Sequence, residues 1–219
     1  MSTDPSAFAQ LLETVRACTV CAPYLPLGPR PIVRLDAEAR LLLVGQAPGT
    51  KVHASGLPFD DRSGDRLRNW LGTDKDVFYG PHIGFMPTGF CYPGRGKSGD
   101  NPPRPECAPL WHHRLRAFLP HVQLTLLIGS YAQNFYLPEQ KNLSLTERCL
   151  RWMEEQGPLI PTVHPSPRNL LWSKRNPWFE AEMVPLIRQR VQTVLGSNVT
   201  EISHNPPEHR HVQIIEPSR

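Results

Sequence analysis

The stretch from Leu41 to Phe59, LLLVGQAPGTKVHASGLPF, decides the expected fold. Its four leading aliphatic residues, Leu41 to Val44, stop at Gly45, which is typical of a buried parallel strand that feeds a tight turn. The turn GQAPG holds two glycines and a proline, so its backbone path is restricted and open to close approach. An ordinary strand-to-loop transition is the alternative interpretation. Ligands of open α/β sheets bind at the carboxyl ends of such strands, so we expect a site here.

Length and composition describe a soluble globular protein. The chain has 219 residues, enough for one α/β domain with a sizeable core, and is 39% hydrophobic and 20% charged. No apolar run has the length of a membrane span, and the first ten residues, MSTDPSAFAQ, lack the features of a signal peptide. We therefore expect a cytoplasmic protein that does not bind membranes. Its net charge of +4 permits nucleic-acid binding without requiring it.

The chain is expected to divide near residue 196. Residues 1–196 carry the apolar patterns of a single domain. Residues 197–219 are polar and contain Asn-Pro-Pro and three histidines, His204, His209 and His211. We expect a flexible or loosely docked tail, with metal binding by these histidines as the less favoured alternative.

Strands and helices are predicted to alternate along the domain. The expected strands are residues 40–44, 83–88, 124–128 and 159–163, and the expected helices are residues 6–16, 65–71 (capped by Ser63), 105–118, a helix from 131, 145–155 and 178–195. This order predicts an α/β fold with three layers, α/β/α, and a mostly parallel four-stranded central sheet. Because Gly45 and His164 both follow strands, we expect them to face one crevice.

Four of the five cysteines form a spaced pattern. Cys18 and Cys21 make a C-x2-C pair, and Cys91 and Cys107 are separated by fifteen residues. Disulfides are rare in the cytosol, whereas four thiolates suit either tetrahedral zinc or an iron–sulfur cluster. The spacing does not choose between these metals, and unliganded reduced cysteines are the remaining alternative. Cys149 lies in a helical pattern and is expected to be a core thiol.

Two sequence motifs and the cysteine spacing carry a family resemblance. GQAPG is followed, after seven residues, by Leu57-Pro58-Phe59, and residues 164–169 read HPSPRN. With the cysteine pattern, the chain from Cys18 to Leu195 resembles the uracil-DNA glycosylase superfamily, and most closely its iron–sulfur branch. In that branch the first motif is G-E-x-P-G, then seven residues, then R-P-F, and the second motif begins H-P-S.

The resemblance implies both a cofactor and an activity. It favours an iron–sulfur cluster of the 4Fe–4S type over zinc at Cys18, Cys21, Cys91 and Cys107. It also implies a monomeric glycosylase of base excision repair, whose partner is DNA that contains uracil or another deaminated base. Such an enzyme flips the base out of the stack and hydrolyses its N-glycosidic bond, leaving an abasic site. No lysine lies in an evident Schiff-base position, so the enzyme is expected to be monofunctional.

The same resemblance assigns roles at the base pocket. Phe59 would stack on the flipped base, while Gly45 and the backbone of Gln46 and Ala47 would face its edge. His164 would stabilise the negative charge that grows on the base oxygen as the bond breaks. A core phenylalanine and a structural histidine are the alternative interpretations of Phe59 and His164.

The resemblance also places the DNA contacts in the second motif. Ser166, Pro167 and Arg168 would pinch the backbone of the strand and push into the gap that the base leaves.

The sequence departs from the family at two positions. The first-motif loop lacks the acidic or amide side chain that positions water, so Asp61 or His53 is expected to do so, with Asp60 beside the substrate. Pro87 stands where relatives carry the asparagine that reads the base edge, which makes Asn169 a possible substitute. Hypoxanthine and xanthine therefore join uracil as candidate substrates.

Two other functions compete with the glycosylase. One is a non-catalytic nucleic-acid-binding module that keeps the fold and the cluster. The other is a zinc-stapled α/β hydrolase that acts on nucleotides. Visible absorbance of a brown iron–sulfur protein would argue against zinc.

Overall fold

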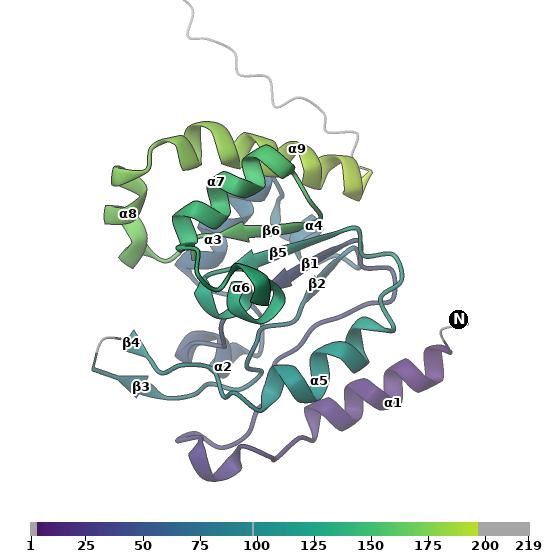
Figure 1. The fold of residues 1–219 in the computed structure, drawn as a ribbon. Coiled ribbons are helices and arrows are strands. Elements are labelled where there is room, and N and C mark those ends of the chain that lie inside the picture. Colours follow the sequence, from purple (N-terminus) through teal and green to yellow (C-terminus); the bar gives the residue numbers. More distant parts are fainter. Residues whose placement is uncertain (1–3, 98, 197–219) are drawn as a thin grey trace, which may run out of the picture.

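The fold was described from a computed structural model that covers residues 4–97 and 99–196, and the predicted tail, residues 197–219, lies outside them. Four parallel strands form the central sheet in the order β2-β1-β5-β6, with helices on both faces (Figure 1). The predicted three-layer α/β/α fold is therefore confirmed. In chain order the elements are α1 (Pro5–Arg16), η1 (Ala22–Tyr24), β1 (Leu41–Val44), α2 (Thr50–Ser55), α3 (Arg62–Leu71), α4 (Lys75–Phe78), β2 (Ile83–Phe85), β3 (Arg95–Gly96), β4 (Gly99–Asp100), α5 (Cys107–Arg116), β5 (Leu124–Ile128), α6 (Ser130–Tyr136), η2 (Pro138–Gln140), α7 (Leu145–Glu155), β6 (Leu159–Thr162), η3 (Pro167–Asn169), α8 (Leu170–Arg175), η4 (Phe179–Met183) and α9 (Val184–Leu195).

Strand β1 contributes to both apolar cores of the molecule. Leu41 and Leu43 pack with residues of α3, α7 and α9, whereas Leu42 and Val44 pack with residues of α1 and α5 on the other face. Every residue of β1 and β5 is buried, as expected for central strands of a parallel sheet that is covered on both sides. The aliphatic run before GQAPG is thus the centre of the fold.

The loops that follow β1 and β2 are joined by backbone hydrogen bonds. The N–H of Thr88 donates to the Gly45 carbonyl, and the N–H of Gly89 donates to the Gln46 carbonyl, both at 2.9 Å. The Thr88 hydroxyl donates to the Gln46 carbonyl as well, at 2.7 Å. These bonds fix the GQAPG turn at the carboxyl edge of the sheet.

The structure differs from the predicted elements where short segments or proline intervene. The last helix is interrupted, because Pro185 has no N–H to donate, and a π-helical turn, η4, precedes α9. Helices α2, α4 and α8 and the hairpin of β3 and β4 were not predicted. Figure 1 shows this hairpin apart from the central sheet.

Within residues 4–97 and 99–196, no helix combines the length and the apolar character needed to cross a membrane.

Candidate active site

A pocket of about 510 Å³ opens at the carboxyl ends of the strands. Several separate loops line it, and the residues that matter for chemistry are Gly45, Gln46, Ala47, Phe59, Asp61, Ser63, Pro87 and His164. Gly45 and His164 therefore face one crevice, as the parallel order of the strands requires. The remaining lining is largely apolar and includes Leu43, Val52 and Phe85.

Phe59 is held beside the pocket in an unusual backbone conformation. Its φ of 56° lies in the left-handed region that residues with a side chain rarely adopt. Its carbonyl oxygen lies so close to Gly64 that a Cβ there would meet it at 1.7 Å, and a Cβ on Gly45 would lie 3.4 Å from its ring. Gly64 thus leaves the space that the Phe59 backbone requires, whereas a Cβ at residue 45 would only touch the ring. Strain of this kind costs about 1–3 kcal/mol and is found most often at functional sites.

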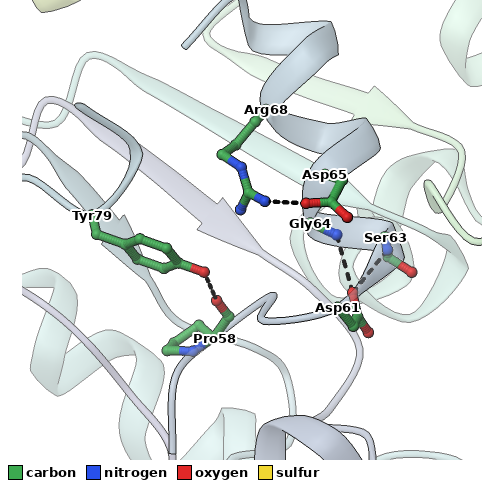
Figure 2. A network of polar contacts seen from close by, with 7 residues as sticks. All are labelled: Pro58, Asp61, Ser63, Gly64, Asp65, Arg68 and Tyr79. Atoms are coloured by element: carbon green, nitrogen blue, oxygen red, sulfur yellow. Dashed lines mark hydrogen bonds and ion pairs between the residues drawn. The ribbon is translucent and has the colours of Figure 1, made fainter. Parts of the chain in front are cut away.

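Asp61 caps helix α3 at the edge of the same pocket. Its Oδ1 accepts hydrogen bonds from the N–H groups of Ser63 (2.8 Å) and Gly64 (3.0 Å), as Figure 2 shows. The prediction of Ser63 as the cap was wrong: Asp61 is the cap, and α3 begins at Arg62 instead of residue 65. Since Oδ1 makes both cap bonds, Oδ2 can accept from a ligand or a water molecule.

The loop that carries Phe59 and Asp61 is also fixed by a side chain from outside the loop, Tyr79. The Tyr79 hydroxyl donates to the Pro58 carbonyl at 2.8 Å (Figure 2). This contact anchors the residue before Phe59, so the backbone is held at both Pro58 and Asp61.

His164 presents one defined ring nitrogen as a donor. Its Nδ1 accepts the N–H of Ser166 at 3.2 Å, so the neutral ring carries its proton on Nε2. The Asn169 amide donates to the His164 carbonyl at 2.8 Å and supports the loop. Burial lowers the pKa of His164, and the charges of Asp61 and Asp100 offset part of this shift. The ring is therefore neutral at pH 7 and has an N–H at the pocket wall.

Asp100 of β4 is an acid that the sequence analysis did not single out. The hairpin brings its carboxylate beside the first motif, where a Cβ on Gly49 would lie 3.4 Å from Oδ2. The next residue, Asn101, accepts the Gln46 side-chain N–H on its carbonyl at 3.3 Å. The local sequence GKSGD predicts a turn, but it contains no signal that Asp100 would lie beside the first motif.

Of the residues predicted for catalysis or base binding, three lie outside the pocket lining. His53 lies on α2 against the ring of Tyr92, with 6.1 Å between centroids, and Asp60 is exposed. Asn169 lines an adjacent hollow of about 660 Å³. Of the two residues expected to activate water, Asp61 is the one that the structure places at the pocket.

The second motif forms one rim of the crevice. Ser166 accepts the N–H of Arg168 on its Oγ at 3.3 Å, and Pro167 is exposed. The Arg168 guanidinium lies against β4, because a Cβ on Gly99 would meet its Nη1 at 2.0 Å. The second motif and the hairpin therefore meet beside the pocket.

The four patterned cysteines line one hollow of about 320 Å³, formed by Cys18, Cys21, Cys91 and Cys107 with neighbouring apolar residues. The N–H of Phe90 donates to the Cys107 sulfur at 3.4 Å. Burial raises the pKa of Cys91 to about 11 and the pKa of Cys107 to about 12, so the free thiols stay protonated at neutral pH. Across the described ranges, no group of three or more His, Cys, Asp or Glu is placed to hold a metal ion.

Cys149 has a different environment from these four. It is fully buried, and its thiol donates to the Pro161 carbonyl at 3.4 Å, which confirms the prediction of a core thiol.

Comparisons with known proteins connect these features to a family. The model of the uracil DNA glycosylase superfamily matches residues 33–188, a range that includes both motifs and the whole sheet. Among solved structures, the NMR structure of a candidate uracil DNA glycosylase from Methanosarcina acetivorans is similar, with 17% identity and a TM-score of 0.41; the match covers 71% of this chain and 92% of that one. Because the family match spans more than half of its residues, the chain belongs to the uracil DNA glycosylase superfamily.

Proposed function

We propose that this protein is a monofunctional DNA glycosylase of base excision repair, which removes uracil or another deaminated base and leaves an abasic site. The observation that carries this proposal is the position of the proton on the His164 ring. Its Nδ1 is used by the Ser166 N–H, so the proton on Nε2 is available at the wall of the pocket. Membership of the superfamily supports DNA as the partner. A base can reach such a pocket only after it leaves the stack.

The proposed chemistry uses the charges around the pocket. As the bond between C1′ and the base nitrogen breaks, its electron pair moves to the base, and negative charge grows on a ring oxygen. The Nε2–H of His164 donates to that oxygen, while Phe59 stacks on the base. The electron-poor C1′ is stabilised by the Asp61 and Asp100 carboxylates. A water oxygen then bonds to C1′, and its proton passes to a carboxylate or to solvent.

We also propose that Cys18, Cys21, Cys91 and Cys107 hold an iron–sulfur cluster of the 4Fe–4S type. Four thiols around one hollow are the donor set of such a cluster, and the Phe90 N–H suits a sulfur that carries negative charge. The resemblance of this cysteine spacing to that of the iron–sulfur branch favours a cluster over a zinc ion at the same four thiols. When bound, the cluster would join the segment after α1 to the start of α5.

Excision from matched oligonucleotides tests the proposed activity. Uracil, hypoxanthine or xanthine would be placed at one position of single- and double-stranded DNA, and abasic sites would be revealed by alkaline cleavage. Excision of uracil would show that the pocket recognises this base without the asparagine that Pro87 replaces. Excision of purine lesions alone would assign a different substrate. Salt-sensitive binding without excision of any base would favour the non-catalytic module.

A further inference from the structure

A second hollow, of about 1060 Å³, lies along the edge of β2 away from β1. One wall is the segment of residues 30–36, which is bonded to β2 at one residue pair: the Arg34 N–H donates to the Phe85 carbonyl (3.0 Å), and the Arg34 carbonyl accepts from the Phe85 N–H (2.6 Å). The charged side chains in the lining are Arg16, Arg30, Arg34 and Asp36, a net charge of +2. We call this hollow the arginine groove.

Two of the guanidinium groups are held in place by backbone carbonyls. Arg30 Nη1 donates to the Ala54 carbonyl at 3.2 Å, and Arg34 Nη2 donates to the Tyr79 carbonyl at 2.5 Å. These carbonyls belong to different segments, the end of α2 and the residue after α4. Each group is therefore ordered before any ligand arrives, and a planar guanidinium has further N–H groups to donate.

Within the described part of the chain, the arginines of the groove have no ion-pair partner. Ion pairs elsewhere join Arg66 to Glu180 and Arg151 to Glu155, but no ion pair among the described residues includes Arg16, Arg30 or Arg34. Asp36 faces the groove, yet its Oδ1 already accepts the N–H of Glu38 at 2.9 Å. Gathering like charges in a hollow without a partner raises the local affinity for an anion.

We propose that the arginine groove binds phosphate groups. Two N–H groups of one guanidinium can donate hydrogen bonds to two oxygens of the same phosphate. Arg30 and Arg34 are bonded to carbonyls of two different segments, so the groove presents two separate guanidinium groups, which suits several linked phosphates better than one. Ile32 and Pro58 line both this groove and the base pocket, so the two sites share a wall. Linked phosphates come from a free polyphosphate or from the DNA backbone, and the second source rests on the proposed function.

A matched pair of double variants tests the groove. Arg30→Gln/Arg34→Gln removes two charges and two bonds to backbone carbonyls. Arg188→Gln/Arg190→Gln does the same on α9, where these arginines donate to the carbonyls of Asn69 (2.7 Å) and Gln156 (2.6 Å). With inorganic tripolyphosphate as the calorimetric probe, we expect the groove variant to bind at least tenfold more weakly than the control. If the double variant does not fold, the single pair Arg34→Gln and Arg190→Gln replaces it.

A second arm identifies the source of the phosphate. The affinity for an undamaged single-stranded oligonucleotide is measured against salt concentration. If DNA enters the groove, the slope of log K against log salt falls by about 0.7 for each lost phosphate contact, again in the groove variant alone. A loss of tripolyphosphate binding with an unchanged DNA slope would assign a free polyphosphate. Equal affinities and equal slopes in both variants would overturn the proposal. Uracil excision by the wild-type protein is measured separately, so failure of the proposed function remains distinguishable.

Discussion

Gly64 determines whether Phe59 can keep its position. A Cβ at residue 64 would lie 1.7 Å from the Phe59 carbonyl oxygen and 2.8 Å from its carbon, and both are backbone atoms. We predict that Gly64→Ala lowers the free energy of unfolding by about 1–3 kcal/mol and weakens excision, because the backbone at Phe59 must shift. Urea denaturation and single-turnover excision would measure the two effects. Gly157→Ala is the control, since a Cβ there meets nothing within 4 Å; equal behaviour of the two variants would contradict this account of Phe59.

Asp61 and Asp100 should both act on His164 through their charge. Each carboxylate raises the pKa of this histidine, so Asp61→Asn and Asp100→Asn should each lower it further. We also predict a loss in excision rate of about 100-fold for Asp61→Asn, whose amide oxygen can still accept the cap bonds. NMR titration of the His164 ring checks the pKa. Asp65→Asn is the control, because Asp65 pairs with Arg68 on the same helix. An unchanged His164 pKa in both Asp61 and Asp100 variants would remove the basis for their proposed role.

At the level of residues, the two sequence motifs were enough to identify the site side chains that belong to the motifs themselves. Phe59 ends the first motif and His164 begins the second, and both line the pocket. Asp100 could not be found in this way, because its position depends on how a short hairpin folds back over Gly49. His53 shows that matching a motif can also select a residue outside the pocket. It was chosen by alignment to the first motif, yet helix α2 directs Val52 to the pocket instead.

The segments that carry the cysteines make a prediction at the level of elements. If a cluster joins the end of α1 to α5, Cys91→Ser should abolish the visible absorbance of the protein and lower its unfolding temperature. Cys149→Ala should keep the absorbance, because Cys149 lies in the core beside Pro161. Spectra and melting curves of protein prepared without air would measure both effects. A colourless wild-type protein would refute the iron assignment.

Sequence predicted the long elements better than the short ones. The observed bounds of β5 and α7 equal the predicted ones, because one is a continuous buried run and the other begins with a Ser144–Glu147 capping box. Helix α2 has six residues, and each strand of the β3–β4 hairpin has two, too few to show a period. These short elements carry part of the site, so its sequence-based description was less complete than that of the fold.

The stability of the whole molecule should depend on His112. This side chain is 2% exposed; its Nε2 donates to the Pro87 carbonyl at 3.0 Å, and its Nδ1 accepts from the Tyr136 hydroxyl at 2.9 Å. Burial lowers its pKa to about 4. The unfolded chain binds this proton near pH 6.5 and the native state does not, so the free energy of unfolding should fall between about pH 6.5 and 4, by up to roughly 3 kcal/mol.

Chemical denaturation at several pH values measures this dependence. His112→Gln can still donate to Pro87 but does not titrate, so the difference between wild type and variant isolates the contribution of His112. Parallel stability curves for the two proteins across this pH range would show that His112 does not bind its proton as described.

The most direct test of the central claim is the single-turnover excision rate of His164→Ala, compared with His53→Ala, on the oligonucleotide that the wild-type protein cleaves best. His164 has its N–H at the pocket wall, whereas His53 lies outside the lining. We predict that His164→Ala loses at least about 100-fold in rate, while its affinity for the same DNA stays within a few-fold of wild type. His53→Ala should excise nearly as fast as wild type. An unchanged rate in His164→Ala would contradict the proposed stabilisation of the departing base.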